Sequence, residues 1–352
     1  MKTTTKFLSL ALAGLLLALL NASSVAAQGP LLQLCLSEAA DFSPVYPTDV
    51  FPANAREIAA VVHLGPGESH KALTATWIAV DVGKAAPPNK EIAKSNIPLN
   101  KMTKISFRLS LLGSMPPGKY RLDVLADGNP WKSSEFTVIE TIKTPDVKQP
   151  ADLLPLRQGQ VWTYSYVQEA GPGAKISLPD VKPDADGKLR FAVTLTVAGT
   201  DAAGNRLDMR RNNALVFQEW WRLDSNGLAS TQRKDVDPHA KDAVEDLTQN
   251  PVIKLDPPQM LLRWPLRAPQ VWTYTPTDHS YSQTIKMWGP LPIKGPTATA
   301  PGYLVLIEQK EGVGALTAER QWIPGVGLVH EVIISTVGDR LAGRSEMVLQ
   351  KY

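Results

Sequence analysis

Apolar and polar residues alternate with a period of two along the first third of the chain. In residues 119–125, Tyr120, Leu122 and Val124 share one face, and the residues that separate them are charged. Side chains of a β-strand point alternately to the two faces of a sheet, so this segment predicts a strand with one buried and one wet face. The same pattern predicts further strands at residues 58–63, 73–82, 105–111 and 135–138.

Turn signals separate these predicted strands. Pro116-Pro117-Gly118 precedes residues 119–125, and Asp127-Gly128 follows them as the turn of a hairpin. About six or seven short strands joined by such turns are typical of a β-sandwich.

The segment from Gly118 to Val138 resembles the last hairpin of bacterial immunoglobulin-like domains, and Trp77 on a central strand fits the same pattern. The resemblance covers residues 28–139. It implies an immunoglobulin-like β-sandwich without the paired cysteines of antibody domains. It also implies a spacer, adhesion or binding role, and no catalytic residue carries over.

The rest of the chain contains an internal repeat. The sequence PLRQGQVWTY at residues 155–164 recurs as PLRAPQVWTY at residues 265–274, with eight identities in ten positions and a spacing of 110. Trp221 precedes a Gly-Leu pair, as does Trp322. These matches indicate two duplicated units, at about residues 151–250 and 258–352. The polar residues 140–150, which include two prolines, are predicted to be the linker before them.

Each unit begins with a predicted strand that carries Val-Trp-Thr-Tyr. Further strands are predicted at residues 189–197, 214–221, 283–288, 302–309, 329–336 and 346–349. The chain is therefore predicted to be mainly β, with a C-terminal, internally duplicated antiparallel domain. That domain is expected to be one curved sheet, a half-barrel or two packed sheets.

Aromatic residues of this domain are the candidate ligand-binding residues: Trp162, Tyr164, Trp220, Trp221, Trp272 and Tyr274. One interpretation is that they anchor equivalent cores. The other is that they line a concave face that binds an apolar ligand or a sugar ring. Trp220 and Trp221 are adjacent, so either one of them is wet or both faces of the sheet are covered. Residues 289–302, rich in Pro and Gly, are expected to form a flap over such a face or a surface loop.

The N-terminus has the features of a cleavable secretory signal peptide. Lys2 and Lys6 precede an uncharged apolar run at residues 7–20, and small residues end at Ala27. We predict cleavage after Ala27 and export by the general secretory route to the periplasm or the extracellular space. The run is shorter than the ~20 residues of a membrane span, although a retained anchor is the alternative. Cys35 follows Leu34, which is not a lipid-attachment sequence, so a soluble product is expected.

Composition narrows the classes of partner. The net charge is +3, and the signal peptide contributes Lys2 and Lys6 without an acidic residue, which leaves +1. This balance argues against a nucleic-acid or acidic-membrane partner. The single cysteine cannot form an intramolecular disulfide, which favours a bacterial envelope for an exported chain. Cys35 lies in an apolar stretch and is predicted to be a buried hydrophobic residue.

The sequence predicts no catalytic residue, metal site or cofactor. Nucleophile-elbow and nucleotide-binding motifs are missing, and the histidines are scattered. His330-Glu331 lies in a predicted strand without the second histidine of a zinc-protease helix. Two acidic segments, residues 184–187 and 235–242, partly match calcium loops, and both are interpreted as solvated turns or loops.

The sequence thus predicts a non-enzymatic exported bacterial protein, a binding or structural module of the cell envelope or secretome. One alternative is a carrier of an apolar or lipid-like ligand in a concave β cavity. The other is a polysaccharide hydrolase whose carboxylates are far apart in the sequence. Whether the partner is a protein, a glycan or an apolar ligand is left open.

Overall fold

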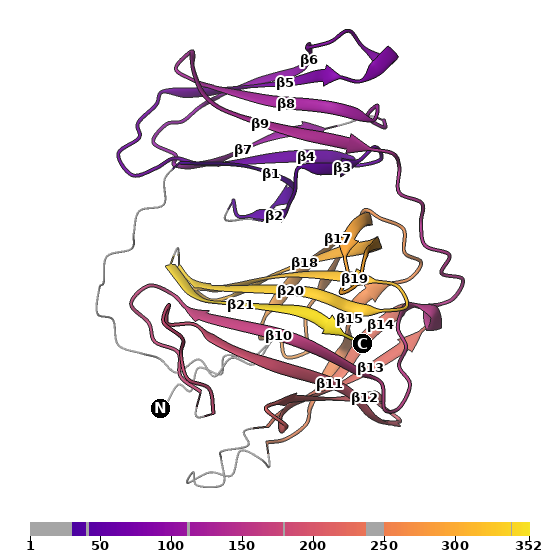
Figure 1. Ribbon diagram of the computed structural model, residues 1–352. Helices are drawn as coiled ribbons and strands as arrows, with labels where there is room; N and C mark the ends of the chain where they lie inside the picture. The colour runs from indigo at the N-terminus through magenta and orange to yellow at the C-terminus, as the bar shows by residue number, and fades with distance from the viewer. Residues whose placement is uncertain (1–29, 40–41, 111–112, 179, 237–249, 339) are drawn as a thin grey trace. The chain divides into compact units, whose positions relative to one another are not determined.

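The computed structural model describes residues 30–39, 42–110, 113–178, 180–236, 250–338 and 340–352. These residues are mainly β, as predicted, with twenty-one strands in three sheets (Figure 1). Two short 3-10 helices, Gly83–Ala85 and Pro150–Leu153, complete the described structure. The chain divides into two compact units between Thr144 and Pro145, inside the segment predicted as a linker.

Two sheets form the N-terminal unit. The first has the order β2-β1-β4-β7, with bounds Pro44–Pro47, Leu31–Glu38, Glu57–His63 and Lys104–Ser110. The second has the order β3-β9-β8-β5-β6, with bounds Val50–Pro52, Asn129–Ile139, Gly118–Ala126, Ala72–Asp81 and Lys90–Pro98. β3 runs parallel to β9, and the other neighbouring strands are antiparallel.

The period-two alternation places apolar residues of both sheets in one core. Trp77 of β5 is 1% exposed, and its ring packs edge-on against Phe136 of β9 with centroids 5.9 Å apart. Tyr120 of β8 stacks on the same phenyl ring at 5.2 Å. Ile58 and Phe107 of the facing sheet belong to the same buried cluster. The two sheets therefore form the β-sandwich that the pattern predicts. Cys35 of β1 is buried, as expected, in a separate cluster with Ala59 and Val61.

Twelve antiparallel strands form a single sheet in the C-terminal unit, in the order β15-β14-β13-β12-β11-β10-β21-β20-β19-β18-β17-β16. The first six in the chain are β10 (Val161–Ala170), β11 (Leu189–Asp201), β12 (Gly204–Arg211), β13 (Ala214–Asp224), β14 (Gly227–Asp235) and β15 (Ile253–Arg263). The last six are β16 (Gln270–Tyr274), β17 (Ser282–Lys294), β18 (Thr299–Glu311), β19 (Gly314–Ile323), β20 (Gly327–Val337) and β21 (Arg340–Lys351).

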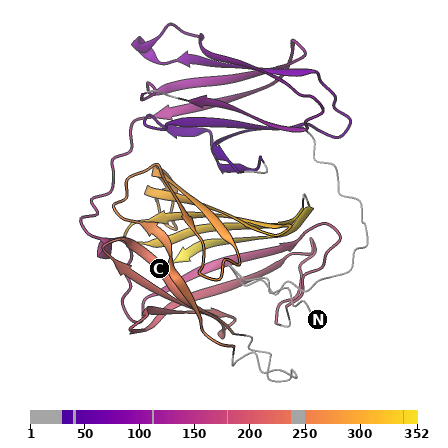
Figure 2. The ribbon, with the colours of Figure 1, turned by 180° about the vertical axis from the view of Figure 1, so that it is seen from behind.

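This sheet curls until it is nearly closed (Figures 1 and 2). Trp221 of β13 and Trp322 of β19 are six strands apart in the sheet order. Six spacings of about 4.8 Å would separate them by roughly 29 Å in a flat sheet. Their ring centroids are 5.9 Å apart, so they meet across the concave face. We call this concave side the inner face.

Each copy of the repeat supplies six consecutive strands, β10–β15 and β16–β21, and the copies meet at two equivalent seams. At one seam, β10 pairs with β21 from Thr163↔Lys351 to Ala170↔Gly343. At the other, β15 and β16 are the edges of the sheet, and no ladder joins them among the described residues. Pro257 and Pro258 lie in β15, and a proline has no N–H to give to a ladder. We call this second junction the open seam.

Several strands differ from the sequence prediction. Charged residues interrupt the alternation in β12, and consecutive prolines hide β15, which is why neither was predicted. β15 makes the first copy end at Arg263, beyond the predicted limit near residue 250. The expectation of a flap or loop at residues 289–302 is wrong, because β17 extends to Lys294 and β18 begins at Thr299.

Candidate functional site

The repeated aromatic residues lie on the inner face of the C-terminal sheet. Trp162 and Tyr164 are each 1% exposed, and their counterparts Trp272 and Tyr274 are 7% and 4% exposed. Val271, directly before Trp272, is 62% exposed, and Thr273, between Trp272 and Tyr274, is also exposed. The Trp and Tyr of each copy therefore share the buried face, as the sequence pattern predicts.

Hydrogen bonds tie these aromatic side chains to the sheet itself. The Trp162 N–H donates to the carbonyl oxygen of Val326 at 2.7 Å, and the Tyr164 hydroxyl donates to that of Leu328 at 3.0 Å. Val326 lies in the turn between β19 and β20, and Leu328 is the second residue of β20. These contacts favour the interpretation that the first copy's aromatic residues anchor a core.

Trp220 and Trp221 are also buried, at 7% and 6% exposure, although they are adjacent in β13. A β-bulge separates them in the pairing with β14. The Trp220 N–H donates to the carboxylate of Asp201 at 2.8 Å, while Trp221 packs against Trp322. Neither residue contributes to an exposed binding surface. All six candidate aromatic residues are buried.

Two ion pairs occupy equivalent positions of the two copies with opposite polarity. Each copy has a β-bulge directly before its shared tryptophan. Two residues before that tryptophan, Glu219 faces Arg233 in the first copy and Arg320 faces Glu331 in the second. These four side chains are at most 16% exposed. Buried ion pairs are costly to desolvate, and each copy nevertheless holds one at this equivalent position.

A third buried pair includes Arg211, the last residue of β12. The guanidinium of Arg211 is 2.8 Å from the carboxylate of Asp180, and the Arg211 side chain is 5% exposed. Arg211 also lies 5.7 Å over the ring of Phe191, which stacks on Tyr166 at 4.8 Å. The carboxylates of all three pairs are thus neutralised by arginines.

A chain of buried amides continues from the first ion pair across the open seam. Arg233 donates to the side-chain oxygen of Gln259 in β15. The Gln259 amide donates to Gln283 of β17 at 2.6 Å, and Gln283 donates to Gln309 of β18 at 2.8 Å. The three glutamines are 0%, 1% and 5% exposed in that order. Side chains therefore bridge the junction that the backbone ladder leaves open.

The backbone makes few connections of its own across the open seam. The N–H and the hydroxyl of Thr277 both donate to the carbonyl oxygen of Asp256, each at 2.7 Å. The Trp272 N–H donates to the carbonyl oxygen of Met260 at 3.4 Å. Thr277 belongs to the loop between β16 and β17, so this loop is fastened to β15 at one point.

Three buried donors of the C-terminal sheet have no hydrogen-bond partner among the described residues: Trp221, Ser230 and Trp322. The hydroxyls of Tyr274 and Tyr281 share a side-chain hydrogen bond with each other. Burial raises the pKa of Tyr274 and that of Tyr281, so both hydroxyls stay protonated and able to donate. Each unpaired buried donor costs about 1–3 kcal/mol. Such groups are normally satisfied by ordered water or by a ligand.

A small cavity adjoins one of these donors. It has a volume of about 10 Å³ and is lined by Trp322, Tyr303, Leu262 and Leu266, among others. That volume corresponds to roughly one water molecule. It is too small for an apolar ligand.

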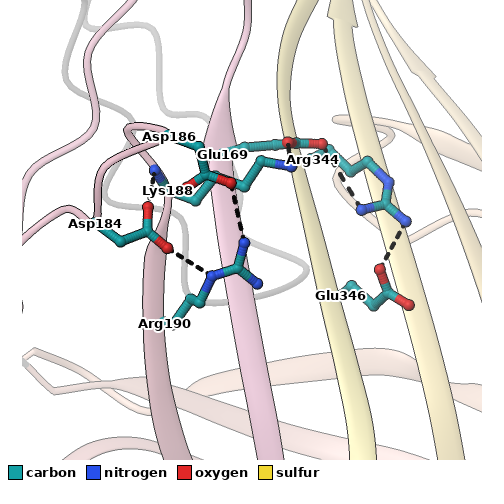
Figure 3. A network of polar contacts seen from close by, with 7 residues as sticks. All are labelled: Glu169, Asp184, Asp186, Lys188, Arg190, Arg344 and Glu346. Atoms are coloured by element: carbon teal, nitrogen blue, oxygen red, sulfur yellow. Dashed lines mark hydrogen bonds and ion pairs between the residues drawn. The ribbon is translucent and has the colours of Figure 1, made fainter.

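A second polar network lies at the ends of β10, β11 and β21 (Figure 3). Glu169 contacts Lys188 at 2.6 Å and Arg344 at 3.7 Å, and Arg344 also pairs with Glu346 at 2.8 Å. His330 of β20 contacts the same Glu346 at 3.0 Å. These side chains are a quarter to a third exposed, as expected of a solvated network that fastens neighbouring strands.

The calcium-like segment at residues 184–187 joins this network as a turn. Asp184 and Asp186 both pair with Arg190, at 2.6 and 3.1 Å. Hydrogen bonds with Asp186 and Arg190 lower the pKa of Asp184 to about 2. The guanidinium of Arg190 thus takes the place that a bound metal cation would need. Across the described parts of the chain, no group of three or more His, Cys, Asp and Glu is arranged to hold a metal. Of the other acidic segment, residues 237–242 lie outside the described residues.

The buried ion pairs and the glutamine chain were not predicted from the sequence. These residues lie at inward-facing positions of their strands. Because their side chains are polar, they interrupt the apolar alternation that would identify such strands. The available signal was the equivalence of Trp221 and Trp322, because Glu219 and Arg320 both stand two residues before the shared tryptophan.

Comparison with known proteins adds little to this description. No family model and no curated protein matches the chain. Among solved structures, it is similar to a candidate lipoprotein from Parabacteroides distasonis, at 12% identity and a TM-score of 0.26. The match covers 56% of this chain and 97% of that one. With a TM-score this low, fold and site rest on the chain's own residues.

The described part of the chain holds no helix with the length and hydropathy needed to cross a membrane.

Proposed function

We propose that the chain is a non-enzymatic exported bacterial protein that acts as a binding or structural module of the cell envelope or secretome. The signal peptide expected at residues 1–27 supports export to the periplasm or beyond. The single buried Cys35 supports a bacterial envelope, where a protein of this size needs no disulfide framework.

The N-terminal sandwich supports an immunoglobulin-like spacer or adhesion module. β3 lies parallel beside β9, and Trp77 occupies a central strand in the core. At the start of β8, the Tyr120 hydroxyl donates to the carbonyl oxygen of Pro116 at 2.6 Å. Immunoglobulin-like sandwiches have this contact, the tyrosine corner, at the corresponding strand.

The observation that carries the proposal is that the buried carboxylates of the C-terminal sheet are matched by arginines. Glu219, Glu331 and Asp180 each form an ion pair. A glycoside hydrolase needs one carboxyl group that gives and takes a proton beside the scissile bond. A carboxylate held by an arginine is poorly suited to that task, which favours binding over hydrolysis. The packed aromatic residues likewise favour a filled interior over an apolar carrier cavity.

A sedimentation experiment with the mature chain, residues 28–352, tests the proposal. The protein is mixed with washed bacterial envelopes, and the pellet is compared with that of an unrelated protein of similar size and charge. We expect enrichment in the pellet without release of new reducing ends. Release of reducing ends would establish a hydrolase, and sedimentation no greater than that of the unrelated protein would refute envelope binding.

A further inference from the structure

We propose that the loop between β10 and β11 closes one end of the inner face, and that the ion pair between Asp180 and Arg211 fastens it there. The structure describes this loop over residues 171–178 and 180–188, which we call the strap. The device goes beyond the proposed function, because it controls access to the interior of the C-terminal sheet whatever the chain binds.

The sheet alone holds Arg211 in place. Arg211 pairs with Val193 of β11, which is fully buried, so both side chains point to the inner face. The Arg211 guanidinium lies 5.7 Å over the ring of Phe191, and that ring stacks on Tyr166 of β10 at 4.8 Å. The arginine is therefore a fixed cation inside the sheet, supported by two neighbouring strands.

Asp180 is the residue of the strap that reaches this cation. The Nε of Arg211 donates to the Asp180 carboxylate at 2.9 Å, and a second guanidinium nitrogen lies 2.8 Å from it. The side-chain amide of Asn212 donates to the same carboxylate at 3.3 Å. The side chains of Asp180 and Arg211 are 18% and 5% exposed, so water cannot easily replace either partner.

The rest of the strap has few polar links to the sheet. Residues 172–175 and 182–187 are exposed on both sides of Asp180, and the N–H groups of Ala174 and Val181 donate to carbonyl oxygens of the strap itself. Among the described residues 172–178 and 180–183, every hydrogen bond or ion pair to the rest of the unit involves Asp180. A single buried pair is therefore the polar fastening of the strap.

The end of the inner face beside the strap is covered. Leu189 begins β11 two residues before the inward-facing Phe191, so it faces inward as well, and it is fully buried. Ile176, Leu178 and Val181 of the strap are half-buried, so its middle faces the sheet. If the carboxylate is removed, an unpaired cation remains inside the sheet, and an open strap lets water reach it. Loss of that one charge therefore favours the open strap.

A cysteine under the strap tests the proposal in the mature chain, with Cys35→Ala as the background. Leu189→Cys is treated with a thiol reagent, and Ile307→Cys, buried in β18, reports opening of the whole sheet. We expect residue 189 to react faster than residue 307 and with a weaker dependence on urea, because opening of a loop exposes far less surface than unfolding. Equal rates and equal urea dependence at the two positions would overturn the strap.

Charge variants test the fastening. Asp180→Asn should raise the reaction rate at residue 189 about 100-fold, the fold-change typical of a buried charge left unpaired. Asp186→Asn is the matched control in the same loop (Figure 3). Its pair with Arg190 is exposed, so the rate should change less than about fivefold. The double variant Asp180→Leu/Arg211→Met removes both charges and should return the rate toward that of wild type.

Equal effects of Asp180→Asn and Asp186→Asn, or a double variant as fast as Asp180→Asn, would refute this ion pair as the fastening. Circular dichroism checks the fold of each variant. The comparison of the probes at residues 189 and 307 uses the native ion pair, so it decides whether the strap opens by itself even where a charge variant does not fold.

Discussion

Replacing Glu331 by Gln removes one charge of a buried ion pair while nearly preserving the shape of the side chain. Arg320 then keeps its charge inside the curled sheet without a carboxylate. The two side chains are 14% and 10% exposed, so solvent offers the arginine little compensation. At an effective dielectric constant near 20, two charges about 4 Å apart attract by about 4 kcal/mol. Removal of one partner of a buried pair typically costs about 3–5 kcal/mol.

We therefore expect Glu331→Gln to lower the unfolding free energy of the C-terminal unit by about 3 kcal/mol, at the low end because the pair is not fully buried. For a unit of this size, the melting temperature should fall by about 6–12 °C. Urea unfolding followed by tryptophan fluorescence measures the change, because Trp162, Trp221 and Trp322 are all buried in this sheet.

Two controls decide whether burial is the reason. Asp224→Asn breaks the exposed pair with Arg222, whose side chains are 32% and 45% exposed, and should cost less than about 1 kcal/mol. The double variant Arg320→Met/Glu331→Met removes both charges and should recover most of the loss. A Glu331→Gln loss below about 1 kcal/mol, or a double variant no better than the single one, would refute the reasoning.

Three further outcomes follow from individual contacts. Tyr120→Phe removes the hydroxyl that donates to Pro116 and should cost the sandwich about 1 kcal/mol in urea unfolding, with no change in its fold by circular dichroism; an unchanged midpoint would contradict a structural role for this bond. Gly227→Ala should destabilise the C-terminal unit by several kcal/mol in thermal unfolding, because its φ is +121° and a Cβ would lie 2.0 Å from the carbonyl oxygen of Leu262; a melting temperature within a degree of wild type would show that the strands part easily. Burial raises the pKa of Glu346, but hydrogen bonds from the neighbouring histidine and arginine outweigh it, and the pKa is lowered overall. This carboxylate therefore stabilises the fold above its unfolded pKa of about 4.3, and the stability is lost as the pH falls through the lower folded value. Glu346→Gln should flatten that acid-side loss in unfolding curves between pH 5 and pH 2, and an unaltered slope would contradict the pairing.

The sandwich was predictable because its strands obey one physical rule. β5 and β8 bury every second residue, so an alternating pattern identifies them without tertiary information. β6 escaped prediction because it is an edge strand whose residues are mostly exposed. A strand with little buried surface has little reason to alternate, and only its neighbour β5 holds it in place.

The inner polar layer was not predictable for a different reason. A prediction that sorts side chains by polarity places Glu219 and Gln259 on the solvent-facing side of their strands. Their burial depends on partners more than ten residues away. The pairing of β13 with β14 sets Arg233 opposite Glu219, and the curl of the sheet brings Gln283 to Gln259. Periodicity reports which residues share a face, but it cannot report that a concave face closes on itself.

The opposite polarity of the two equivalent ion pairs bears on how a duplicated sheet folds correctly. Copies with the same strand order carry interchangeable hairpins, and exchange between them is a known failure of repeat proteins. If β13 paired with β20, Glu219 would face Glu331, and the complementary pairing would set Arg320 against Arg233. Like charges buried together cost several kcal/mol, whereas identical pairs in both copies would tolerate the exchange. Buried ion pairs contribute little net stability, but with opposite polarity in the two copies they distinguish the native pairing from its exchanged alternative.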